Sequence, residues 1–336
     1  MANSVNPDKL RSILNLQTFG ILLVVLGHSI PRGSIDTYPP DIIWLHSFIY
    51  SFHMPLFMFI SGYLFIHSNR DRSIRYVSFI KDKAIRLLIP YIMLSTLAFF
   101  PKVILSKYAN RPIDFSFVTY IRGIIYPTEN PIKAMWFLPV LFSIFIAAPF
   151  LRTMINQTRL VATLAVIGAL VLLNIFNPVY TNVFGLQITM DYFFYFFLGC
   201  LTAAQCKASL NRSGKIHLVL ITLTALILVN LFLPQLTEKI PMLFAAFIGI
   251  CFSVSLACFM DNHGWKFLGY IDGYSYQIYL LSWFVQIFFR ILYQINIINE
   301  YICFILMLSC GALIPVLIAR FIERKLPIGK IFVGMK

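Results

Sequence analysis

The chain has 336 residues, of which 59% are hydrophobic and only 12% are charged, and its formal net charge is +14. This composition excludes an ordinary soluble globular protein. The basic residues cluster in short connections between apolar runs, which is typical of the positive-inside bias of membrane proteins and argues against nucleic acid as a partner.

Apolar runs long enough to cross a bilayer recur along the whole chain. We therefore predict an all-α, polytopic membrane protein that consists of one domain, residues 1–336, with a helical bundle over about residues 12–322 and a basic tail over residues 323–336. The expected spans, about ten in number, lie near residues 13–30, 42–67, 87–105, 134–151, 160–176, 189–204, 216–233, 240–260, 271–293 and 301–322.

The densest basic segment lies between the second and third spans, and it predicts which side of the bilayer faces the cytoplasm. It contains Arg70, Arg72, Arg75, Lys81, Lys83 and Arg86. Because Lys and Arg accumulate in cytoplasmic loops, we place this segment and both termini in the cytoplasm. The first span leads straight into another, so we expect it to be retained and not cleaved as a signal peptide. Short loops favour a bacterial inner (plasma) membrane.

The first span carries two polar residues on one face. Gln17 and His28 are eleven residues apart, which leaves them about 20° from eclipsed and about 16 Å apart along the helix axis. Gly20 and Gly27 flank this face, where small residues permit close approach of a neighbour. An ionisable side chain at membrane depth is expensive, so His28 indicates a functional site that suits a long, thin ligand.

The second span contains Pro55 two residues after His53. A proline inside a helix removes a backbone hydrogen bond, so we predict a kink here with His53 beside it. Non-helical backbone is tolerated at membrane depth where it lines a cavity. The histidine could therefore support a substrate site or simply bond a neighbouring helix.

Other polar residues near the span ends each have a functional and a structural interpretation. Arg86 could bind a cofactor phosphate or only set topology. Trp136 could contact a substrate or belong to the aromatic belt. Asp191 could orient an imidazole, bind a sugar hydroxyl or cap a helix. Tyr279 and Ser282 lie in a hydroxyl-rich stretch, residues 274–283, that could line a polar channel or bond neighbouring helices.

The six cysteines lie within or at the edges of apolar runs, at Cys200, Cys206, Cys251, Cys258, Cys303 and Cys310. Their spacing matches no zinc or redox motif. Buried free cysteine behaves as a small hydrophobe. We therefore predict neither a disulfide nor a metal site.

Several short motifs follow one another along the chain in a characteristic order. They read ILLVVLGHS at the end of the first span, FHMPLFMFISGYLF, RLLIPY, WFL, FFLG and finally SYQIYLLS at residues 275–282. In order and spacing they resemble the integral-membrane acyltransferases known as acyltransferase family three. Within that family the chain is most similar to sugar O-acetylases of the fucose 4-O-acetylase type.

The resemblance implies an activity and roles for two residues. Members are held to move an acyl group, commonly acetyl, from cytosolic acyl-coenzyme A to a hydroxyl of a surface polysaccharide or its lipid-linked precursor. By resemblance His28 matches the catalytic histidine, acting as general base or as acyl-carrying nucleophile. Arg86 matches a basic position implicated in cofactor binding. The implied partners are thus acetyl-coenzyme A, a carbohydrate acceptor and the lipid bilayer.

The chain departs from the family pattern at two positions. Gln17 occupies a position that is usually Arg or Lys, and Ser282 stands where a histidine often ends the last motif. An amide can still hydrogen-bond a pantetheine amide or a phosphate oxygen, but it cannot neutralise charge. The cofactor phosphates would then depend on Lys9, Arg11 and the basic segment.

Two other functions are compatible with the same residues. A transporter or flippase of a polysaccharide intermediate could use His28 and His53 along its path. Against it, we find no inverted repeat and only one acidic residue, Asp191, near a span. A catalytically silent partner in a polymer-synthesis complex is the other alternative, and Gln17 is its best argument.

Overall fold

The computed structural model describes residues 7–30, 40–70, 72–106, 112–157, 160–205, 215–232, 238–263 and 269–335, among which there is no strand. The α-helices are α1 (Pro7–His28), α2 (Pro40–Tyr50), α3 (His53–Asn69), α4 (Tyr76–Ile104), α5 (Phe117–Ile125), α6 (Phe137–Gln157), α7 (Leu160–Phe176), α8 (Leu186–Gln205), α9 (Ile216–Phe232), α10 (Lys239–Asn262), α11 (Ser275–Gln294) and α12 (Glu300–Lys325). Short 3-10 helices are η3 (Pro127–Glu129), η4 (Lys133–Trp136), η5 (Val183–Gly185) and η7 (Pro327–Val333).

Seven segments of the described chain are long and apolar enough to cross a membrane. They contain α1, α2 with α3, α4, α6, α8, α10 and α12, whereas α7 and α9 are shorter apolar helices of 17 residues each. The prediction of an all-α, polytopic membrane protein is therefore confirmed. The number of ten spans and the cytoplasmic placement of both termini stay predictions.

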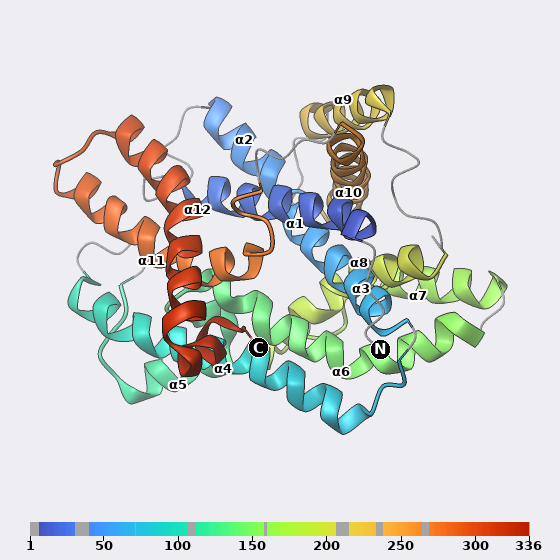
Figure 1. The fold of residues 1–336 in the computed structure, drawn as a ribbon, viewed down its shortest axis with the longest axis horizontal. Coiled ribbons are helices and arrows are strands. Elements are labelled where there is room, and N and C mark those ends of the chain that lie inside the picture. The colour runs from blue at the N-terminus through green and yellow to red at the C-terminus, as the bar shows by residue number, and fades with distance from the viewer. Residues whose placement is uncertain are drawn as a thin grey trace.

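Helix α1 lies in the middle of the molecule, between α11 and α12 on one side and α9 and α10 on the other (Figure 1). It packs against α3, α10, α11 and α12. Its side chains Ile13, Leu16, Ile21 and Val25 are all buried in the core. The helix that carries both Gln17 and His28 is thus held by neighbours on several sides.

Helices α3 and α8 cross in backbone contact, with one glycine on each helix at the crossing. A Cβ atom added to Gly62 would overlap the carbonyl oxygen of Phe196, and one added to Gly199 would overlap that of Phe59. The Sγ of Cys200 also lies 3.4 Å from the Gly62 carbonyl oxygen, within reach for an S–H donor. Small residues let membrane helices approach to backbone contact, so this crossing holds α3 closely against α8.

The second predicted span is two helices and not one kinked helix. Helix α2 ends at Tyr50, and α3 begins at His53, which places Pro55 in the first turn of α3. Proline clashes with the carbonyl four residues earlier, here that of Ser51, so a continuous helix is disfavoured at this point. Side chains satisfy two of the carbonyls exposed by the break: His53 Nδ1 donates to Ile49 at 2.8 Å, and Ser51 Oγ donates to Phe48 at 2.8 Å.

The third and last spans extend further than hydropathy indicates. Helix α4 begins at Tyr76, so most of the basic segment after the second span is helical and only its first part is a connection. Lys and Arg are good helix formers, and hydropathy alone cannot detect helical turns that they occupy. Similarly, α12 continues to Lys325 and the predicted tail then folds into η7.

The two ends of the bundle differ in charge. We call the end at which α1 begins the basic end, and the opposite end, at which α1 finishes, the His28 end. The basic end includes Arg11, Arg70, Arg86, Arg152 and Lys330. Helix η7 packs against α4 and α12 at the basic end.

Candidate active site

A cavity of about 300 Å³ lies between α1, α3, α4, α6 and α11. Most of its wall is apolar, formed by residues such as Phe57, Leu141 and Phe145. Its polar and charged wall residues are Gln17, Ser61, Ser68, Lys83, Arg86, Ser275, Tyr276 and Tyr279. An apolar cavity with a few convergent polar groups is the usual form of a small-molecule site.

Two cations of α4 stand at the basic end of this cavity, each lying on an aromatic ring. The Lys83 ammonium is 3.8 Å from the centroid of Phe145, and the Arg86 guanidinium is 5.5 Å from that of Tyr276. The Tyr276 hydroxyl also donates to the Arg86 carbonyl oxygen at 2.7 Å. Ring contacts of this kind attract cations and hold their long side chains in place.

Tyr279 forms part of the cavity wall and bonds the segment that precedes α6. Its hydroxyl donates to the carbonyl oxygen of Ala134 at 2.5 Å, and its ring meets Phe137 edge-on with centroids 5.6 Å apart. Trp136 is not a wall residue; its ring lies 5.1 Å from that of Tyr192. The structure thus places Tyr279 at the cavity and Trp136 behind it.

His28 lies in a cluster of rings contributed by α1, α2 and α3, which we call the imidazole cluster and which consists of His28, His46, Tyr50 and His53. The Tyr50 hydroxyl is 3.4 Å from His28 Nδ1. The Tyr50 ring stacks on His46 at 3.9 Å between centroids and meets His53 at 4.7 Å. The break between α2 and α3 therefore brings two further histidines close to His28.

Helix α11 holds the carboxyl end of α1 through polar residues spaced one helical turn apart. Gln286 Nε2 donates to the Val25 carbonyl oxygen at 3.0 Å and to Ser29 Oγ at 3.2 Å. The Arg290 guanidinium donates to the carbonyl oxygens of His28 at 3.1 Å and Ile30 at 3.2 Å. A cation at a helix carboxyl end also complements the helix dipole.

These two residues are absent from the site predicted from the sequence. The available signal was the recurrence of Ser282, Gln286, Arg290 and Gln294 at four-residue spacing within an apolar helix. Such spacing places polar side chains on one face of a helix. Ser282 is itself buried on that face.

The cavity and His28 share one face of α1. Gln17 and Val24 both line the cavity, and His28 follows Val24 by one helical turn, about 6 Å along the axis. His28 is not itself a wall residue. Met54, which directly follows His53 in the chain, lines the cavity. The cavity thus extends from the cations of α4 to within one turn of the imidazole cluster.

A family model described as an acyltransferase domain, that of acyltransferase family three, matches residues 11–321. That range includes nearly all of the helical bundle. The chain belongs to this family. Neither the curated proteins nor the solved structures contain a match. The protein is accordingly a multi-pass membrane acyltransferase, and its assignment to the sugar O-acetylase subgroup stays a prediction.

Arg11, another predicted site residue of the acyltransferase, lies away from the cavity wall. Arg11 Nε is 3.9 Å from a carboxylate oxygen of Asp261 on α10, to which Ser12 Oγ also donates at 2.6 Å. The side chain of Lys9 lies outside the described residues. The basic residues that meet the cavity itself are Lys83 and Arg86.

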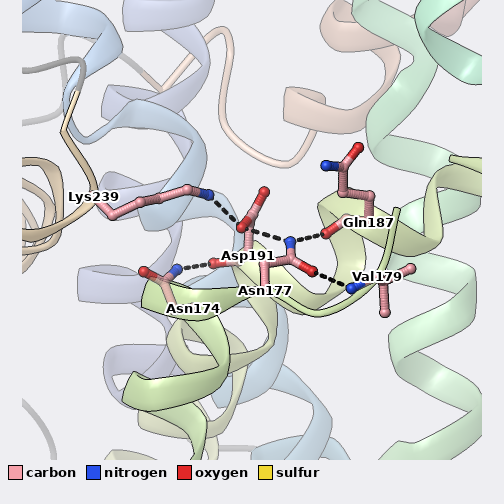
Figure 2. A network of polar contacts seen from close by, with 6 residues as sticks. All are labelled: Asn174, Asn177, Val179, Gln187, Asp191 and Lys239. Atoms are coloured by element: carbon pink, nitrogen blue, oxygen red, sulfur yellow. Dashed lines mark hydrogen bonds and ion pairs between the residues drawn. The ribbon is translucent and has the colours of Figure 1, made fainter. Parts of the chain in front are cut away.

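Asp191 belongs to a polar network between α7, α8 and α10 (Figure 2). Its carboxylate accepts from Lys239 Nζ at 2.5 Å and from Asn177 Nδ2 at 2.9 Å, while its carbonyl oxygen accepts from Asn174. None of these partners is an imidazole. The network ties the amino-terminal ends of α8 and α10 together, and its ion pair is partly exposed.

The described part of the acyltransferase contains no group of three or more His, Cys, Asp or Glu residues placed to hold a metal ion. Five cysteines are free, and Cys206 lies outside the described residues. The polar groups of the cavity wall are cations, hydroxyls and one amide, and the imidazole cluster lies one turn beyond them.

Proposed function

We propose that the acyltransferase moves an acetyl group from cytosolic acetyl-coenzyme A to a hydroxyl of a surface polysaccharide or its lipid-linked precursor. The observation that carries this proposal is the course of the cavity. It begins at Lys83 and Arg86, follows the face of α1 that bears Gln17, and reaches Val24, one turn before His28.

The donor would fit this course with its charged part at the basic end. Lys83 and Arg86 suit phosphate oxygens, since guanidinium binds phosphate bidentately and ammonium as a point charge. The pantetheine arm then lies along α1, where the Gln17 amide can bond one of its amides. The distance of about 16 Å from Gln17 to His28 suits an arm that carries the thioester to the imidazole.

In the general-base mechanism, His28 Nδ1–H donates to the Tyr50 hydroxyl oxygen, which leaves Nε2 with a free lone pair. Nε2 takes the proton of the acceptor hydroxyl as its oxygen attacks the thioester carbonyl. The tetrahedral intermediate collapses by breaking the C–S bond, and the imidazolium returns the proton to the departing thiolate. The products are an O-acetyl ester and coenzyme A.

In the nucleophilic mechanism, Nε2 attacks the thioester carbonyl first and the C–S bond breaks. The departing thiolate takes the Nδ1 proton, so that neutral acetyl-imidazole and the thiol of coenzyme A form. The acceptor hydroxyl then attacks this intermediate, which releases the ester and restores the imidazole. Both mechanisms place the acceptor at the His28 end. We propose that this end faces the outside of a bacterial inner membrane, so that acyl transfer also moves the acetyl group across the bilayer.

The test uses the purified full chain in lipid nanodiscs, with [14C]acetyl-coenzyme A and a lipid-linked glycan extract. We expect His28→Ala to lower the transfer rate by about 10²- to 10⁴-fold, which is the usual contribution of a general base. The matched control is His263→Ala, which removes an imidazole from the basic end and should leave the rate unchanged.

Mass spectrometry of surface glycans from cells with and without the protein then identifies the acceptor. Loss of an acetyl mass in deletion cells and in His28→Ala cells supports the proposal. Full acetylation in His28→Ala cells contradicts the assigned chemistry. Loss of polymer export with unchanged acetylation would indicate transport instead of acyl transfer.

A further inference from the structure

The end of the chain folds back onto the basic end of the bundle, beside α4 and α11. We call residues 327–335 the C-terminal turn. It is tied to α11 by Gln277, whose buried Nε2 donates to the Val333 carbonyl oxygen at 3.1 Å. Gly334 has a left-handed backbone with φ 65°, and a Cβ atom added there would overlap the ring of Tyr276. This tight fit fixes the turn beside the residue that supports Arg86.

Two hollows at the basic end are shared between the C-terminal turn and α4. One, of about 490 Å³, is lined by Arg86, Asp272, Gly273, Tyr274, Gln277, Glu323, Lys330, Gly334 and Met335. The other, of about 360 Å³, is lined by Asp82, Ile85, Arg86, Lys330, Ile331, Gly334 and Met335. Both have Arg86 and Lys330 in their walls, and Arg86 is also in the wall of the bundle cavity. Arg86 is therefore common to the walls of all three spaces.

The charges of the larger hollow match a nucleotide better than a simple anion. Arg86 and Lys330 supply two cations for phosphate groups. Its two carboxylates are already oriented, since Asp272 accepts from Thr18 Oγ1 at 2.8 Å and Glu323 accepts from the Tyr274 hydroxyl at 3.3 Å. Carboxylate oxygens have further acceptor capacity and can bind ribose hydroxyls or an adenine amino group.

We infer that the C-terminal turn builds the subsite for the nucleotide of the acyl-coenzyme A donor, with Lys330 and Arg86 holding its phosphates from opposite chain segments. This inference rests on the proposed function and adds a residue and a segment to it. The nucleotide occupies the hollows, and only the pantetheine arm passes Arg86 into the bundle.

The experiment compares two donors in the full chain in nanodiscs: acetyl-coenzyme A and acetyl-pantetheine, which lacks the nucleotide. We expect Lys330→Ala to raise the KM for acetyl-coenzyme A by about tenfold, the effect of one charge-assisted bond, with kcat unchanged. Its KM for acetyl-pantetheine should equal that of the unaltered protein. Lys330→Arg should restore the low KM, and Gly334→Ala, which displaces the turn, should resemble Lys330→Ala.

The matched control is Lys325→Ala, an exposed cation at the end of α12 that lines none of the three spaces. Its KM for acetyl-coenzyme A should not change. The nucleotide subsite is wrong if Lys330→Ala leaves the KM for acetyl-coenzyme A unchanged, or raises the KM for acetyl-coenzyme A and that for acetyl-pantetheine equally. The proposed function still stands in that case, provided that the unaltered protein transfers acetyl groups. An effect of Lys330→Ala that occurs only with anionic lipid also contradicts the subsite. If the unaltered protein uses neither donor, the proposed function itself is wrong.

Discussion

The two ends of α1 lie in very different surroundings. In the half of α1 nearer the basic end, Gln17 lines a cavity whose wall shares Arg86 with two further hollows. At the His28 end the same helix face meets the ring of Tyr50, which in turn packs against His46 and His53. One end is open and cationic, whereas the other is filled with aromatic side chains.

This difference matches two different tasks. A binding region gains from space and from charges that a ligand can reach, whereas a reacting group gains from being held in one orientation. At the His28 end, Gln286 and Arg290 donate to backbone carbonyls or to Ser29, so they fix the helix end and not the ring itself. Variants that change kcat should therefore cluster at the His28 end, and variants that change the donor KM at the basic end.

The largest effect in this comparison is expected for Arg290→Met, which removes both hydrogen bonds to the carboxyl end of α1. A small displacement of a catalytic group can reduce its rate by about 100-fold, and we expect a fall in kcat of that order. The donor KM should stay within about twofold, because Arg290 does not line the cavity. Steady-state kinetics with acetyl-coenzyme A measures both constants.

Arg290→Lys keeps a cation at the same place and should recover most of the lost kcat. The control is Gln294→Met, which alters the next polar position on the same face of α11. If Arg290→Met lowers the thermal midpoint but the folded protein keeps its kcat, Arg290 only stabilises the bundle. A rise in donor KM in place of a fall in kcat would remove the contrast between the two ends.

A smaller effect is expected halfway along α1, for Gln17→Leu. Loss of one hydrogen bond to the pantetheine arm corresponds to about 1 kcal/mol, or a roughly fivefold rise in the donor KM. Because the contact is with the arm and not the nucleotide, acetyl-coenzyme A and acetyl-pantetheine should be affected equally. An effect limited to acetyl-coenzyme A would mean that Gln17 contacts phosphate.

The polytopic helical class could be predicted from the sequence, because apolar runs of bilayer length are a strong signal. The interruption at Ser51 could not be placed, because Pro55 indicates a local disturbance without deciding between a kink and a break. The helical start of α4 was also missed, because the charged residues between Tyr76 and Arg86 favour a helix but give no apolar signal. Helix boundaries depend on such local chemistry more than on average composition.

The site could be predicted in part. The spacing of Gln17 and His28 follows from helix geometry alone, and Gln17 does line the cavity with Val24 between the two. The four-residue spacing in α11 could have marked Gln286 and Arg290 as one polar face, but it does not identify their partners, which come from a distant part of the chain. Lys330 carries no such signal. Lys330 in particular lies in a basic tail, and only the fold of η7 brings it to Arg86.

The smallest effect is expected for Tyr50→Phe, which keeps the ring of the imidazole cluster but removes the hydroxyl 3.4 Å from His28 Nδ1. At this length the hydrogen bond is weak, so we expect kcat to fall only about two- to fivefold.

Gly27→Ala is the matched test of ring position, because an added Cβ would lie 3.0 Å from Cε2 of Tyr50 and push the ring away. If the ring's position matters more than its hydroxyl, Gly27→Ala will lower kcat further than Tyr50→Phe, with the donor KM unchanged in both. A change confined to the donor KM would place the pantetheine arm, and not the reacting group, at the His28 end.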